Sequence, residues 1–263
     1  MRVAAVGDNC VDVYYTMNRF YPTGNAVDFL INLQQQGTET ALVSVLGNDV
    51  FGAAIKNILE RADINISHLH QGDKPSAVAQ MNLVNGDRVH EKFSGNVLED
   101  FVLSDEDRDF IKQFDIVYSE RWSRIGRYIS DLQQPGQVWV HDFSKRVDDS
   151  TNEEILPYLQ YAFFSCPGRG PELLQFLQDT QKKTKGGIVI AMLGEEGSLA
   201  FDGKSFTSQK AQKVEVVNTV GAGDAYISGF IRGLCLGENL VECMARGTEI
   251  ASKIIQVFEP YVL

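Results

Sequence analysis

Residues 214–226 read Val-Glu-Val-Val-Asn-Thr-Val-Gly-Ala-Gly-Asp-Ala-Tyr, and the small residues Gly221 to Gly223 stand directly before Asp224. The valine-rich start predicts a strand, the small residues predict a tight corner, and the apolar residues that follow predict a helix. Unpaired amides at the start of a helix, together with the positive end of its dipole, form an anion site. Glycines at this corner would let a phosphate approach the backbone closely. The stretch therefore predicts an α/β domain with an anion site at this helix start.

Three interpretations of this corner compete. The dinucleotide fingerprint G-x-G-x-x-G fails at its third glycine, where Tyr226 stands, and a carboxylate at Asp224 would repel a bare pyrophosphate. A plain glycine turn, with Asp224 stabilising the helix dipole, is the second interpretation. Phosphoryl transfer is the third, because it needs donors around the moving phosphoryl group and a carboxylate near the attacking hydroxyl. The residues of this corner leave the last two interpretations open.

Strand and helix patterns alternate along most of the chain, which predicts one domain over residues 1–263 with a mostly parallel sheet covered by helices. The expected strands are 3–6, 40–46, 116–119, 138–142, 161–165 and 188–193, and the expected helices are 26–36, 50–62, 104–113, 125–132, 171–184, 223–236 and 240–256. Two extended segments at 77–84 and 88–93 interrupt this alternation. Asn85-Gly86-Asp87 joins them with a hairpin signal, so they form a candidate lid.

Composition restricts the classes of function. The formal charge is -11, from 24 basic and 35 acidic residues, which argues against nucleic acid or an anionic membrane as a partner. A nucleotide is still compatible, because a helix terminus and Mg²⁺ can hold a triphosphate. The four cysteines form no C-x-x-C pair, and the start of the chain lacks a signal-peptide pattern. We therefore expect free thiols and a cytoplasmic location.

Several other polar segments favour structural roles. Residues 197–205 imitate a phosphate-binding loop but have five residues between the glycines, and Asp202-Gly203 indicates a hairpin turn instead. His68 and His70 alternate along a probable strand, and a pair without a third ligand is more typical of a surface than of a metal site. The acidic run 104–107 is interpreted as solvated charge at a helix start. His141 ends a predicted strand, where a pocket role and a structural role are both open.

Two motifs together resemble a known family. Residues 218–224 are similar to the D-T-x-G-A-G-D signature of the PfkB/ribokinase carbohydrate kinases, and residues 47–52 resemble the G-x-D-x-x-G element that precedes it by about 170 residues. Residues 7–12, 24–25 and 193–197 extend the resemblance over nearly the whole chain. The resemblance implies an ATP-dependent sugar kinase that uses Mg²⁺. It also implies a ribokinase-like α/β fold with a small β lid formed near 10–20 and 75–95, and we expect a homodimer through that lid.

Carried over residue by residue, the resemblance assigns roles to most of the motif positions. Asp224 matches the catalytic base, and the amides of Gly221, Ala222 and Gly223 match the anion hole for the γ-phosphate. The residues expected to bind the substrate are Asp8, Asn9, Asp12, Gly24, Asn25 and Arg88. Those expected to border the nucleotide are Gly194, Gly197, Thr219, Ala251 and Ser252.

The chain departs from the family pattern at some positions. Asn218 replaces the leading Asp of the signature, Met192 stands where Thr is usual, and Thr23 replaces the first glycine of a pair. The N-x-x-E element that helps to organise Mg²⁺ would fall near 165–168, where neither Asn nor Glu is present. The metal ligands are therefore unassigned, and the nearby Glu172 or Asp142 could take the place of the missing Asn and Glu.

Five short segments, 7–12, 24–27, 66–70, 87–89 and 142–144, resemble the fructoselysine 6-kinase branch, which phosphorylates fructosamines at the sugar 6-hydroxyl. An acidic pocket from Asp8, Asp12 and Glu91 would suit a substrate that carries an ammonium group. Alternatively, Asp8 and Asp12 both serve sugar hydroxyls alone. A kinase for another sugar, such as fructose or ribose, and a regulator that binds sugar or nucleotide without catalysis are the alternative functions.

Overall fold

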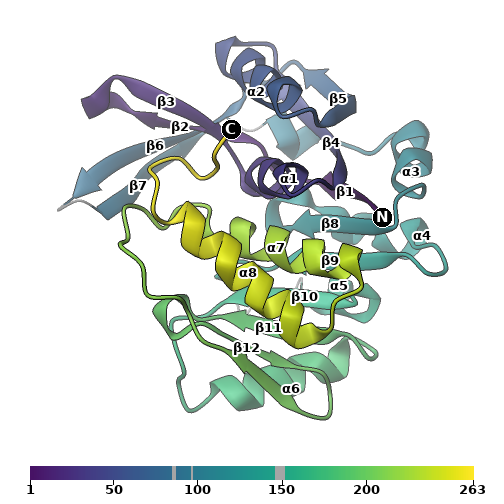
Figure 1. The fold of residues 1–263 in the computed structure, drawn as a ribbon. Helices are drawn as coiled ribbons and strands as arrows, with labels where there is room; N and C mark the ends of the chain where they lie inside the picture. Colours follow the sequence, from purple (N-terminus) through teal and green to yellow (C-terminus); the bar gives the residue numbers. More distant parts are fainter. Residues whose placement is uncertain (85–86, 96, 146–151) are drawn as a thin grey trace.

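The computed structural model describes residues 1–84, 87–95, 97–145 and 152–263 (Figure 1). Nine described strands form the large sheet in the order β13-β12-β11-β10-β9-β8-β1-β4-β5. In this order, every pair of adjacent strands from β11 to β5 is parallel. The strands β12 and β13 extend one edge in antiparallel pairing. The predicted, mostly parallel sheet is therefore confirmed. The strands are β1 (Arg2–Val6), β4 (Glu39–Gly47), β5 (Asn65–Gly72), β8 (Ile116–Glu120), β9 (Val138–Asp142), β10 (Tyr161–Ser165), β11 (Ile188–Met192), β12 (Ser198–Phe201) and β13 (Phe206–Gln209).

Helices cover both faces of this sheet (Figure 1). They are α1 (Asn25–Gln35), α2 (Val50–Arg61), α3 (Asp105–Ile111), α4 (Ile129–Leu132), α5 (Asn152–Ile155), α6 (Leu173–Lys183), α7 (Ala222–Leu236) and α8 (Leu240–Ile254). Neighbouring residues of β10 lie in different cores: Phe163 shares a core with residues of α1, α7 and α8, and Phe164 shares one with residues of α6. Because both faces are covered, inner strands such as β1, β10 and β11 are apolar almost throughout.

A second, four-stranded sheet extends beside the large one, in the order β3-β2-β6-β7 (Figure 1). Its strands are β2 (Cys10–Tyr14), β3 (Arg19–Thr23), β6 (Ala77–Val84) and β7 (Asp87–Ser94), which confirms the expected small sheet near 10–20 and 75–95. The expected turn at Asn85-Gly86 lies outside the described residues. The chain returns to this sheet after α8, where the Tyr261 hydroxyl donates to the Pro22 carbonyl at 2.6 Å.

Two predicted elements were wrong. No strand forms at 214–218; instead, the amides of Val217 and Asn218 donate to the Ile255 carbonyl, at 2.8 and 3.2 Å, just beyond α8. Valines favour extended backbone, but a strand also needs a neighbour, and here a helix end takes the hydrogen bonds. The helix predicted over 125–132 is interrupted: a 3₁₀ turn spans Ile125–Arg127 and only Ile129–Leu132 is α-helical.

The segment that imitates a phosphate-binding loop is the β12–β13 hairpin, as predicted. Asp202 fixes its turn by accepting hydrogen bonds from the amides of Lys204 and Ser205, at 2.8 and 2.7 Å. Among the described helices, none has the length and apolar character that crossing a bilayer requires.

Candidate active site

Buried acidic side chains gather at the carboxyl ends of the parallel strands. Glu120 and Asp142 are the last residues of β8 and β9 and stand opposite each other in the register of the two strands. Asp8 follows the end of β1, and its amide donates to Glu120 Oε1 at 2.9 Å. Ligands of open α/β sheets bind at this edge, so the fold itself places the acidic cluster at the expected site.

Asp224 joins this cluster from the first turn of α7. Gly221 begins the helix with φ 77°, and a Cβ there would lie 2.6 Å from the Cβ of Pro260, so the position requires glycine. The Asn25 side-chain amide donates to Asp224 Oδ1 at 3.2 Å, which brings the starts of α1 and α7 together. Gly24, just before α1, has φ 121°, and a Cβ there would lie 2.6 Å from Asn9 Cα. Two glycine corners therefore allow the two helix starts to converge.

Burial and like charge dominate the electrostatics of the cluster. Burial raises the pKa of Asp224 well above its usual value, the charge of Asp142 adds to this, and the Asn25 hydrogen bond opposes it. Burial, together with the charge of Asp12, raises the pKa of Asp8 to about 6 although backbone amides oppose it. Burial likewise raises the pKa of Asp142 to about 6. A cation placed among these groups would lower their pKa values and stabilise the site.

The predicted anion hole is only partly available. The Ala222 amide already donates to the Thr219 carbonyl at 3.2 Å, closing the turn before α7. The space beside Gly223 is open, since the nearest atom to a Cβ placed there would be Met192 Cε at 3.6 Å. Gly223 is thus better placed than Ala222 to receive a phosphate, whereas Pro260 fills the space beside Gly221.

The Asn218 departure from the family signature has a structural explanation. Its Oδ1 accepts from the Val220 amide at 3.1 Å, and its Nδ2 donates to the Phe258 carbonyl at 2.7 Å. A carboxylate could make the first bond but not the second. The side chain therefore ties the glycine corner to the C-terminal segment.

The residues expected to border the nucleotide come from the turn between β11 and β12, the turn before α7, and α8. Gly194 and Gly197 lie in the turn between β11 and β12, with φ 59° and 88°, and the preceding Met192 contacts the space beside Gly223. Ser252 is buried on α8, where its hydroxyl lies within hydrogen-bond distance of the Glu249 carbonyl and Gln212 Oε1, at 2.8 and 2.9 Å. Ala251 is half-buried on the same helix. Their contact with a nucleotide stays a prediction.

The residues expected to bind substrate have different surroundings. Asp12 is buried on β2 of the small sheet. The Asn9 amide group donates to Ser44 Oγ and the Val45 carbonyl, at 2.7 and 3.0 Å, while the buried Oδ1 of the same side chain has no partner among the described residues. Arg88 lies on β7, and its side chain is outside the described structure. Glu91 is exposed and accepts from Gln80 and Asn82 on β6, so it is not part of the buried cluster.

Sequence reasoning missed two buried acids. Glu120 fixes the loop after β1, and a side chain at position 7 would displace it, because a Cβ on Gly7 would lie 2.5 Å from Glu120 Oε1. Its place at the end of a parallel strand was the signal that could have identified it. Asp28, in the first turn of α1, accepts from the Thr23 hydroxyl at 2.6 Å, which gives the unusual Thr23 a role.

The structural interpretation of His141 is favoured. Its Nδ1 lies 2.8 Å from Ser119 Oγ, and burial lowers its pKa to about 3, so the ring is neutral in the core. Of the two substitute metal ligands, Glu172 is exposed before α6, whereas Asp142 is buried among the site carboxylates. Asp142 is therefore the better candidate.

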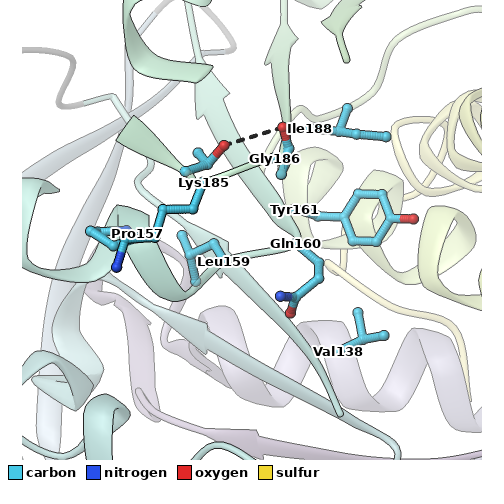
Figure 2. Close-up of a pocket in the computed structure, with 10 residues that line it drawn as sticks. Val138, Pro157, Leu159, Gln160, Tyr161, Lys185, Gly186 and Ile188 are labelled. Carbon is cyan, nitrogen blue, oxygen red and sulfur yellow. Dashed lines mark hydrogen bonds between the residues drawn. The ribbon is translucent and has the colours of Figure 1, made fainter. Parts of the chain in front are cut away.

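A separate pocket lies at the other end of the parallel strands, where β9, β10 and β11 begin (Figure 2). It contains Val138, Tyr161 and Ile188, the first residues of β9, β10 and β11, with Lys185 nearby. The Thr184 hydroxyl closes the adjoining turn by donating to the Gly187 carbonyl at 3.2 Å. This pocket has no carboxylate in its lining and lies away from the carboxyl ends, so it is not part of the candidate active site.

Comparison with known proteins agrees with this geometry. The model of the pfkB family carbohydrate kinases matches residues 8–136 and 150–262. The chain is 35% identical over 254 residues to a fructoselysine 6-kinase of Shigella flexneri, covering 97% of both chains. It is 28% identical over 267 residues to a fructosamine kinase of Bacillus subtilis, covering 98% of this chain and 92% of that protein.

Solved structures share the fold. A ribokinase of Arabidopsis thaliana, complexed with ribose and ATP, superposes with a TM-score of 0.82 at 19% identity, covering 97% of this chain and 92% of that one. Since so much of the two chains superposes, the nine-stranded sheet and the small sheet form a ribokinase-like arrangement.

Proposed function

This chain belongs to the pfkB family of carbohydrate kinases, and we propose that it transfers the γ-phosphate of ATP to the 6-hydroxyl of a fructosamine such as fructoselysine. The observation that carries the proposal is the buried Asp224 carboxylate at the start of α7, held by Asn25 beside the open space at Gly223. Phosphoryl transfer needs this combination of a base and an anion site.

Each side chain has a defined part in the proposed reaction. Asp224 accepts the proton of the attacking hydroxyl, and its raised pKa makes it a stronger base than an exposed aspartate. The helix start at Gly221 and Gly223 stabilises the charge of the transferred phosphate. Asn25 orients the Asp224 carboxylate through its 3.2 Å hydrogen bond. The small sheet, which carries Asp12, would exclude water when it closes over the sugar.

The acidic character of the site supports a substrate with an ammonium group. Asp8 and Asp12 are both buried, and the charge of Asp12 contributes to the raised pKa of Asp8. A positively charged substrate would relieve this repulsion, whereas a neutral sugar would not. We therefore assign the ammonium group to Asp8 and the sugar hydroxyls to Asp12.

The same cluster fits Mg²⁺, which prefers oxygen ligands. Asp142 is buried beside Glu120, its pKa is raised to about 6 by burial, and its Oδ1 accepts from the Ser144 amide at 2.8 Å. A divalent cation would offset the cost of ionising such a carboxylate. We assign Asp142 as the side chain that would hold Mg²⁺, which would neutralise charge on the phosphates.

Assembly and location are further parts of the proposal. Apolar side chains on or beside the small sheet are exposed, namely Tyr15, Phe20, Val89 and Phe93. These exposed apolar side chains support a homodimer through the small sheet, which light scattering would measure as twice the mass of the chain. The four cysteines are free, which fits the reducing cytoplasm.

A coupled ADP-release assay over fructosamines, fructose and ribose tests the proposal. The expected result is the highest kcat/KM on fructoselysine. A preference for ribose or fructose would keep the kinase reaction but overturn the fructosamine assignment. No ADP release with any sugar, from protein that still binds ATP, would support the non-catalytic regulator instead.

A further inference from the structure

Two histidines and one aspartate converge at an edge of the large sheet, in contacts that the phosphoryl transfer does not use. His68 and His70 alternate on the edge strand β5 and share one of its faces, while Asp107 projects from α3. His68 Nδ1 and His70 Nε2 lie 2.7 and 2.8 Å from the same atom, Asp107 Oδ1. All three atoms lie within 4.8 Å of one another.

The surrounding structure holds these three side chains in place. Asp107 is 1% exposed, and its other oxygen, Oδ2, accepts from the Ser104 amide at 3.0 Å in the capping box that begins α3. The His68 ring stacks on Phe110, with ring centroids 4.0 Å apart. The side chain of His70 is 43% exposed, so the group opens to solvent on that side.

The donor set has the chemistry of a transition-metal site. Two imidazole nitrogens and one carboxylate oxygen suit Zn²⁺, whereas Mg²⁺ prefers oxygen ligands alone. A neutral imidazole has one protonated and one bare nitrogen, so a change of tautomer presents lone pairs to a metal without net proton loss.

The spacing is close to what such an ion needs. Tetrahedral Zn²⁺, with bonds of about 2.0 to 2.2 Å, separates neighbouring ligand atoms by about 3.4 Å. Both ring nitrogens must therefore move back from Asp107 Oδ1 by roughly 0.6 Å. The side chains of His68 and His70 are 21% and 43% exposed, so each has a solvent side toward which it can move.

We propose that His68, His70 and Asp107 form a binding site for a divalent cation of the zinc class, distinct from the Mg²⁺ of the kinase reaction. Water completes the coordination on the exposed side. The bound ion joins the edge strand β5 to α3, elements that lie apart in the sequence, and so stabilises this edge of the sheet.

Calorimetric titration of the chelator-treated, full-length protein with ZnCl₂, in saturating Mg²⁺, tests the proposal. The His68→Asn/His70→Asn double variant measures background binding, including that of the four free cysteines. The parent is expected to bind one more equivalent than this variant. His70→Asn alone is expected to weaken that binding by at least about tenfold, the scale on which perturbed metal sites lose affinity.

Asp105→Asn is the matched control, because Asp105 lies in the same turn of α3 with its side chain 92% exposed. It should leave zinc affinity unchanged, and zinc should raise the unfolding temperature of the parent but not of the double variant. Circular dichroism checks that each variant is folded. Equal zinc binding by the parent and the double variant, or unchanged affinity in His70→Asn, would overturn the site and leave a metal-free hydrogen-bonded group.

Discussion

Asp8 and Asp107 are both buried carboxylates, but their pKa values shift in opposite directions. Burial raises the pKa of Asp8 to about 6, and the neighbouring Asp12 adds to the rise. Burial also acts to raise the pKa of Asp107, but hydrogen bonds from His68 and His70 outweigh it, so that pKa is lowered. Burial alone therefore does not decide the state of a carboxylate; its neighbours do. Around Asp8 the chain supplies further acids, and we propose that a ligand supplies the positive charge, whereas around Asp107 two histidines supply the donors.

The largest effect is expected at the acidic cluster, from Asp224→Asn. Turnover should fall by about 10² to 10⁴, the scale for loss of a positioned general base, because the amide cannot accept the hydroxyl proton. ATP affinity should change little, since the Asn25 contact and the glycine corner are kept. Initial rates and a separate ATP-binding titration measure the two effects. Turnover within about threefold of the parent would exclude Asp224 as the base.

Asp8→Asn should stabilise the unliganded protein at high pH. The folded pKa of Asp8 lies above its ordinary value of 3.8, so the folded chain holds the extra proton and loses stability as pH rises from about 4 to 6. The variant stays neutral and avoids that loss, which amounts to up to about 3 kcal/mol at 1.36 kcal/mol per pKa unit.

Urea unfolding at about pH 8 and pH 4 measures this difference. The variant should exceed the parent at the higher pH and match it at the lower. Asp105→Asn, on the surface, serves as the control with no such dependence. A variant that is less stable than the parent at both pH values would show that Asp8 is satisfied within the chain, as Asp107 is.

Replacing Asp8 and Asp12 separately should distinguish their roles in substrate binding. Asp12→Ala is expected to lower kcat/KM on every sugar, because the hydroxyls are common to all. Asp8→Ala should cost about 1 to 3 kcal/mol on fructoselysine, or roughly 5- to 150-fold, and little on fructose. Because the measured quantity is a ratio between substrates, partial unfolding cannot mimic it. Equal losses on both substrates would refute the ammonium role of Asp8.

The smallest effect, with the opposite sign to that of Asp8→Asn, is expected from Asp107→Asn. The amide keeps an acceptor for the Ser104 backbone amide in the α3 cap but weakens the bonds to His68 and His70, so stability should fall by about 1 kcal/mol near neutral pH. Urea unfolding of metal-free protein, beside Asp105→Asn, measures it. If Asp107→Asn stabilised the protein, Asp107 would behave as Asp8 is expected to, and the contrast between the two carboxylates would be refuted.

Much of the architecture could be predicted from local sequence. The apolar runs of β8 to β11 and the periodic patterns of α1, α2, α6, α7 and α8 lie within a few residues of their expected bounds. The glycine corner at Gly221 and the Asp202 turn also followed from sequence, because backbone conformation is a short-range property.

The sequence by itself determined the parallel sheet, the small second sheet and the corner that carries Asp224, since periodicity and turn chemistry act over a few residues. Only the tertiary structure decided which polar groups meet. Glu120 and Asp28 lie in the acidic cluster, and residues 217–218, which were expected in a strand, hydrogen-bond to the end of α8. Asp107, interpreted from sequence as a solvated helix charge, is the buried partner of two histidines. Such pairings connect residues far apart in the chain, and the burial that sets their charge exists only once the layers have packed.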